Sequence, residues 1–145
     1  MLSGPNLCSR LPHRGSMCLL DAVVVWDRER IHCTASSHRL PTNPLRNASG
    51  LPAVSGVEYA TQAMALHASL IFDDSAPRAG YLAGLRDLAL AVDWLHDIGT
   101  DLDVFAALRS SDGRGAIYEF HLEANRSLLL SGRATVVYSS LRSVR

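Results

Sequence analysis

The feature that most constrains the fold of this chain is a long apolar stretch that carries a single formal charge. Residues 47–72 read NASGLPAVSGVEYATQAMALHASLIF, and Glu58 is the only charged side chain among them. Apolar side chains recur there at helical spacing, so the pattern predicts one helix over residues 52–72. Small residues fill most of the other positions, which indicates a helix that is buried on nearly all sides. We therefore expect a sheet that curves around this helix.

Shorter patterns on both sides of the helix predict strands. Residues 18–26 (CLLDAVVVW) and residues 31–37 are separated by a polar turn, which indicates a β-hairpin. Residues 38–50 contain two prolines and two asparagines and are expected to form a long loop, a kind of segment that often carries function. Four more strands are predicted after the helix, over residues 81–92, 102–110, 116–124 and 128–138. Residues 81–92 also fit a helix by propensity, but their short period and their place before further strands favour a strand. The layout predicts one α+β domain over residues 1–145.

The composition excludes several classes of function. With 48% hydrophobic and 19% charged residues and a net charge of zero, the chain is globular and has no field that would attract nucleic acid or an anionic membrane. It has no lysine, which excludes a lysine Schiff base. The apolar stretch is interrupted by polar side chains and does not read as a membrane span, and the first ten residues do not read as a secretory signal. We therefore expect a cytoplasmic protein.

The three cysteines, Cys8, Cys18 and Cys33, are odd in number and lack the spacing of metal ligands. We expect them to be reduced thiols. The histidines His32, His96 and His121 have no companion ligand at metal spacing, so no metal site is predicted. His67 lies on an apolar background within the helix, which is typical of a core or an interface histidine.

Glu58 on its own allows two interpretations. An ionised carboxylate in apolar surroundings is costly unless it is paired, hydrogen-bonded or protonated, and carboxyl groups in such places often serve as general acids or bases. The simpler interpretation is a partly exposed carboxylate that is stabilised by the dipole at the start of its helix. Isolation alone favours this simpler interpretation.

Two short motifs resemble those of a known enzyme family. Leu11-Pro12-His13-Arg14, followed by Leu19-Leu20-Asp21 and Val23, is similar to the opening of the 3-hydroxyacyl-(acyl carrier protein) dehydratases. Leu51-Pro52-Ala53, followed by Gly56-Val57-Glu58-Tyr59 and Gln62, resembles the central helix of that family. The chain looks most like the divergent branch found in aryl-polyene pigment gene clusters. The resemblance implies a hotdog fold, in which a curved antiparallel sheet wraps a long central helix and two subunits pair edge to edge.

The resemblance also implies a site. In the family, a loop histidine and a helix carboxylate from opposite subunits are the catalytic pair, and the carboxylate carries over onto Glu58. The usual Gly-His-Phe-Pro element is absent, and His38, farther upstream, is the remaining loop candidate for the base. His13 belongs to the opening turn and is expected to be structural. Backbone N–H groups at Gly56 and Val57 would bind the thioester carbonyl, since the helix start favours negative charge.

Gln62 lies one turn beyond Glu58 and is expected to take part in substrate binding by orienting the carboxylate, or else it is a buried amide that is satisfied by the backbone. The predicted reaction is removal of water from 3-hydroxyacyl thioesters on acyl carrier protein. No cofactor is needed beyond the phosphopantetheine that carries the substrate. Two alternatives remain open at this point: a hotdog acyl thioesterase, and a catalytically incomplete subunit of a heterodimer. Both a homodimer and a heterodimer with another hotdog subunit are compatible with the sequence.

Overall fold

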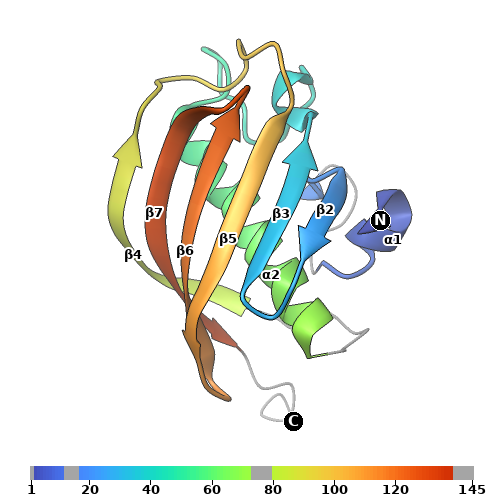
Figure 1. The fold of residues 1–145 in the computed structure, drawn as a ribbon. Coiled ribbons are helices and arrows are strands. Elements are labelled where there is room, and N and C mark those ends of the chain that lie inside the picture. The colour runs from blue at the N-terminus through green and yellow to red at the C-terminus, as the bar shows by residue number, and fades with distance from the viewer. Residues whose placement is uncertain (1, 12–16, 73–79, 139–145) are drawn as a thin grey trace, which may run out of the picture.

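One antiparallel sheet curves around one long helix, as the sequence predicts (Figure 1). The computed structural model describes residues 2–11, 17–72 and 80–138. Every strand pair in the sheet is antiparallel, and the strand order is β1-β2-β3-β5-β6-β7-β4. The strands are β1 (Leu2–Ser3), β2 (Ala22–Trp26), β3 (Arg30–Ala35), β4 (Gly80–Leu90), β5 (Leu102–Ser111), β6 (Gly115–Ala124) and β7 (Ser127–Tyr138). The predicted hairpin, central helix and later strands are all present. Residues 81–92, which also fit a helix by propensity, form most of strand β4.

The central helix α2 (Gly56–Ile71) is buried for eleven of its sixteen residues. It lies against the inner face of the sheet, where alternate side chains of β5 and β6 point toward it. The predicted helix began at Pro52, but Pro52 has an extended backbone and the turn that follows it, Ala53–Ser55, is a 3₁₀ helix. The helix therefore enters the core through a tight turn just ahead of Glu58.

The N-terminal region differs from the prediction. The strand expected to begin at residue 18 begins at Ala22, because the backbone of Leu19 bonds to the side chains of Gln62 and Ser37; the N–H of Asp21 already bonds to the Thr34 carbonyl of β3. A short helix α1 (Gly4–Cys8) and the strand β1 were not predicted. The opening turn that contains His13 lies outside the described residues.

The prediction of reduced thiols was wrong for Cys8 and Cys18 and right for Cys33. Cys8 and Cys18 form a disulfide that ties α1 to the segment before β2, and Cys33 is free and buried. Their separation of ten residues gives no sign of this pairing, because it depends on where α1 docks. Within the described part of the chain, no helix is both long and apolar enough to cross a bilayer.

Strand β4 is the last strand of the sheet and pairs only with β7 (Figure 1). None of its residues is buried in the single chain, and Tyr81, Leu82, Leu85 and Leu90 are 37–62% exposed. The pairing with β7 shifts register twice along its length, with the second shift next to Asp87, which has a positive φ. This edge leaves apolar side chains and backbone groups available to another chain.

Candidate functional site

Glu58 lies on the first turn of α2 and is partly exposed. Its Oε2 accepts a hydrogen bond of 3.3 Å from the Nε2 of Gln62, one turn along the helix. The helix dipole stabilises a negative charge at this position. The carboxylate is therefore held in part by its own helix, and the residue keeps some exposed surface.

Gln62 uses its whole side-chain amide. The carboxamide is fully buried; its Oε1 accepts the N–H of Leu19 at 2.9 Å, and its Nε2 donates to the carbonyl oxygen of Met17 at 2.6 Å. Both sequence interpretations of Gln62 are thus realised together, since it is satisfied by backbone and also contacts Glu58. Substrate binding by Gln62 stays a prediction.

His38 lies in the short 3₁₀ helix Ser37–Arg39 and has no exposed surface. Its Nε2 lies 3.0 Å from the carbonyl oxygen of Ile98. A carbonyl only accepts, so Nε2 carries the proton and Nδ1 is left as the acceptor. That Nδ1 is buried and has no hydrogen-bond partner among the described residues. Burial lowers the pKa of His38, because removal from water disfavours the charged ring.

The structure does not bring the two predicted catalytic residues together within one subunit. The hydrogen bond of His38 leads to the loop between β4 and β5, and the Arg39 beside it bonds to the same loop through Asp101 and the Gly99 carbonyl. In this chain His38 fastens two loops together. Its role as the base stays a prediction.

Gly56 and Val57 occupy the turn where the 3₁₀ helix becomes α2. The N–H of Gly56 is directed to the carbonyls of Ala53 and Val54 within that turn. A Cβ at Gly56 would come within 2.6 Å of a Leu130 methyl group, so close packing against the sheet accounts for the glycine. Carbonyl binding by the Gly56 N–H would require the turn to open. Carbonyl binding by the Val57 N–H stays a prediction.

Tyr59 holds the loop of His38 onto the helix, a contact that no pattern along the chain predicts. Its hydroxyl lies 2.7 Å from the Oγ of Ser37 and 3.0 Å from the Nδ2 of Asn43. Burial raises the pKa of Tyr59 above its ordinary value. The neighbour of Glu58 on α2 therefore fixes the geometry of the long loop.

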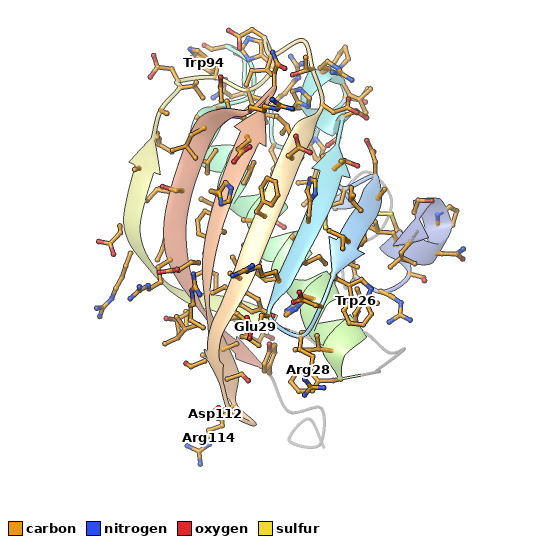
Figure 2. The ribbon with its side chains drawn as sticks, viewed as in Figure 1. Trp26, Arg28, Glu29, Trp94, Asp112 and Arg114 are labelled. Atoms are coloured by element: carbon orange, nitrogen blue, oxygen red, sulfur yellow. A yellow bond between two sulfur atoms is a disulfide. The ribbon has the colours of Figure 1, made fainter. Side chains whose placement is uncertain are left out.

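The loop between β4 and β5 also bonds to the segment just before α2, where Ala53 donates to the Asp93 carbonyl and Leu95 donates to the Leu51 carbonyl. The Nδ1 of His96 accepts the N–H of Leu51 at 3.0 Å, and the ring packs against Gly50, which has a φ of +127°. Trp94 lies edge-on to His96, with 5.4 Å between ring centroids, and its side chain stands at the end of the sheet opposite to Asp112 (Figure 2). His96 thus fixes the chain just before the helix that carries Glu58. The only feature of the sequence that could have indicated this role of His96 is a polar ring within a predicted turn.

The other histidines of the described residues, His32, His67 and His121, are structural or lie on the outer face of the sheet. The Nδ1 of His67 bonds to the Tyr118 hydroxyl and its Nε2 to a backbone carbonyl, which confirms a core histidine. His32 and His121 stack on the two faces of Phe105. Among the described residues, no group of three potential ligands could hold a metal ion.

The structure has a cavity of about 560 Å³, but Glu58 does not line it. It lies on the sheet face that points away from α2, among Phe105, Arg109, Glu119 and Arg133. Glu119 bridges the two arginines, which hold the pKa of its carboxyl below the ordinary value.

A long helix wrapped by one curved antiparallel sheet, with a carboxylate on its first turn, defines the hotdog class of acyl-thioester proteins. A family model described as "ApeP-like: ApeP dehydratase" matches residues 5–143. The chain belongs to this dehydratase family. The predicted fold and the predicted dehydratase activity are therefore confirmed.

Solved structures agree with this fold. The dehydratase heterocomplex ApeI:P from Xenorhabdus doucetiae superposes with a TM-score of 0.83 at 23% identity, over 94% of this chain and 92% of that chain. A conserved protein from Pseudomonas aeruginosa superposes with a TM-score of 0.64 at 16% identity, over 90% and 97% of the two chains. A mutant thioesterase from the same organism gives 0.60 at 12% identity, over 84% and 82%. A comparison with curated proteins found no match. The thioesterase alternative is supported less well than the dehydratase.

Proposed function

We propose that this chain is one subunit of a heterodimeric dehydratase that removes water from 3-hydroxyacyl thioesters. The thioester would be carried on the phosphopantetheine of an acyl carrier protein, in polyene biosynthesis. The observation that carries the proposal is the asymmetry of the site. Glu58 is held in part by its helix and keeps some exposed surface, whereas His38, the only histidine of the preceding loop, is buried against Ile98. A chain of this kind supplies the carboxylate, and a second chain supplies the base.

Two further observations support a second subunit. Strand β4 ends the sheet with exposed apolar side chains, as expected for an edge that pairs with another strand. The similar structure from Xenorhabdus doucetiae is itself a heterocomplex. Two copies of this chain would form a site with two buried His38 rings, so a different partner fits better.

The chemistry needs three groups. A histidine of the partner takes the C2 proton of the substrate, and the electron pair of that bond forms the C2–C3 double bond. The bond between C3 and the hydroxyl oxygen breaks, and Glu58, which enters this step protonated, gives its proton to that oxygen, so that water leaves and Glu58 becomes a carboxylate. The thioester oxygen gains charge in this step and is stabilised by the start of α2, at Val57.

The test uses the chain purified alone and together with a second hotdog subunit. The substrate is a 3-hydroxyacyl thioester of N-acetylcysteamine or of acyl carrier protein, and the enoyl product is followed by its absorbance. We expect activity only in the complex and a loss of about 10²- to 10⁴-fold in Glu58→Gln. The matched control Glu29→Gln, on an exposed turn, should match the wild type. Full activity of Glu58→Gln would refute the assignment.

Two outcomes would support the alternatives. If the chain alone is active and His38→Gln loses activity without unfolding, the base is His38 after a loop movement. If free thiol is released from the acyl thioester and no enoyl product forms, the chain acts as a thioesterase. We also propose a cytoplasmic location, which fits a substrate on a carrier protein; a disulfide is unusual in that reducing compartment.

A further inference from the structure

The Cys8–Cys18 disulfide lies beside the hydrogen bonds that orient Glu58. Both cysteines are partly exposed and are therefore within reach of a small reductant. Cys33 has no exposed surface, and burial raises the pKa of its thiol to about 12, so it is unreactive. The redox chemistry available to this chain is thus that of one accessible disulfide.

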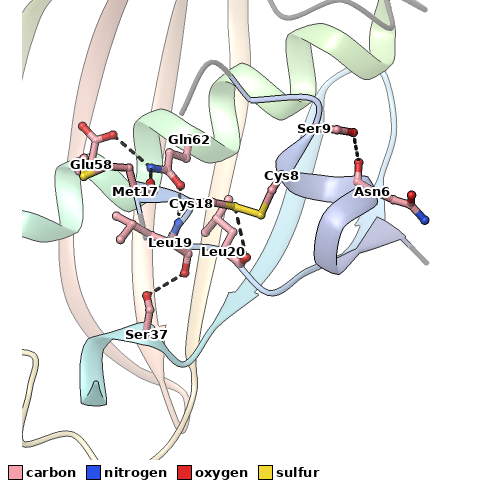
Figure 3. Close-up of a disulfide and its surroundings, with 10 residues drawn as sticks. All are labelled: Asn6, Cys8, Ser9, Met17, Cys18, Leu19, Leu20, Ser37, Glu58 and Gln62. Carbon is pink, nitrogen blue, oxygen red and sulfur yellow. Dashed lines mark hydrogen bonds between the residues drawn. A yellow bond between two sulfur atoms is a disulfide. The ribbon is translucent and has the colours of Figure 1, made fainter. Parts of the chain in front are cut away.

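Cys18 stands between the two residues whose backbone holds Gln62 (Figure 3). The Met17 carbonyl accepts from the Nε2 of Gln62 at 2.6 Å, and the Leu19 N–H donates to its Oε1 at 2.9 Å. The same Nε2 lies 3.3 Å from Glu58. One peptide unit and two hydrogen bonds therefore separate the disulfide from the carboxylate.

The same segment also reaches the loop of His38. The Leu19 carbonyl accepts from the Oγ of Ser37 at 2.8 Å, and this Oγ lies 2.7 Å from the Tyr59 hydroxyl. Residues 17–19 therefore bond to both sides of the candidate site. If the backbone of residues 17–19 became more mobile, Gln62 would be affected first, because both of its backbone partners lie in this segment.

We propose that the disulfide positions Glu58 through Met17 and Gln62, and that its reduction by a dithiol slows the dehydration. This inference rests on the proposed function of Glu58. One thiolate of the dithiol attacks a sulfur of the disulfide, the S–S bond breaks, and the second thiol releases the mixed disulfide. The products are two cysteine thiols and the oxidised dithiol. Disulfides of cytosolic proteins are mostly transient and often redox-sensing, which fits such a role.

The effect is local, because α1 has other means of staying docked. Leu7 and Leu11 are fully buried in the core, on either side of the disulfide-bonded Cys8. Reduction would therefore loosen residues 17–19 without releasing the helix. A small displacement at Glu58 is enough, since a misplacement of about 1 Å can cost about 10²-fold in rate.

The experiment measures kcat and KM of the dehydratase complex before and after reduction with dithiothreitol. We expect kcat to fall by roughly tenfold with little change in KM. Cys18→Ser should reproduce the reduced state without any reductant. Cys33→Ala keeps the disulfide and should respond as the wild type does. In Gln62→Met, which keeps the length of the side chain but makes no such hydrogen bonds, reduction should no longer change kcat.

A second readout does not depend on catalysis. The Leu19 amide donates to Gln62, so its hydrogen exchange should speed up on reduction of the wild-type chain. Unchanged exchange at Leu19, or a kcat effect that persists in Gln62→Met, would overturn the inference. Failure of the proposed function would look different: Glu58→Gln would be fully active, whatever the exchange at Leu19.

Discussion

Substitution of Gly50 by alanine tests whether the segment before α2 is built around the His96 ring. Gly50 has a φ of +127°, where side chains other than glycine are strained by about 1–3 kcal/mol. A Cβ at Gly50 would also come within 2.1 Å of the His96 ring. The ring would have to move and give up its hydrogen bond with the Leu51 N–H, at a cost of about 1–3 kcal/mol. We expect Gly50→Ala to lower the free energy of unfolding by about 2–6 kcal/mol.

The assay is urea unfolding at a fixed protein concentration, with the free energy taken from the midpoint and an unchanged slope. His96→Ala separates the two contributions, because it removes the overlap and leaves the backbone strain. The loss in free energy of unfolding of the double variant should therefore be smaller than the summed losses of the two single variants, by about 1–3 kcal/mol. Gly99→Ala, in the same loop as His96, is the matched control. A Cβ there meets no atom within 4 Å, and stability should change by less than about 1 kcal/mol. Wild-type stability of Gly50→Ala, or strict additivity with His96→Ala, would refute this account.

Three more predictions concern the loops, the buried histidines and the edge of the sheet. Tyr59→Phe should lower the free energy of unfolding by about 1–2 kcal/mol in the same urea assay, because it removes both hydrogen bonds to the long loop. Burial lowers the pKa of His38 and His67, so below about pH 6.5 the unfolded chain binds protons that the folded chain does not. Stability should be full above that pH and fall on acidification by at most about 1.4 kcal/mol per pH unit for each histidine, with a flatter profile in His67→Gln. Leu85→Arg on β4 should weaken subunit association roughly tenfold in sedimentation experiments. Val25→Arg should not weaken it, because Val25 is also exposed but lies on β2, near the other end of the strand order.

Much of the fold could be predicted because its signals are local. The single charge at Glu58 in an apolar stretch required a buried helix, and the β-branched patterns around it required a sheet. The contact between Glu58 and Gln62 also follows from the sequence, since residues four apart face each other on a helix. These features depend on spacing along one element.

The parts that could not be predicted depend on how separate elements meet. The Cys8–Cys18 pairing depends on where α1 docks, and the burial of His38 depends on the position of Ile98, sixty residues away. Spacing along the chain shows neither where α1 docks nor where Ile98 lies relative to His38. The loop histidine could therefore be named from the sequence, but whether a substrate can reach it could not.

The two register shifts of β4 restrict which strand can pair with its open edge. A regular edge strand offers its backbone groups to almost any extended chain, and this promiscuity leads to aggregation. In β4 the ladder slips after Leu82 and again after Arg86, so an approaching strand meets short matched stretches separated by misaligned ones. A subunit without its partner would thus aggregate less through this edge. A strand whose own irregularities match those of β4 could still pair with it along the full length. The backbone register of β4 therefore restricts which partner strand can pair with it, independently of the side chains at the interface.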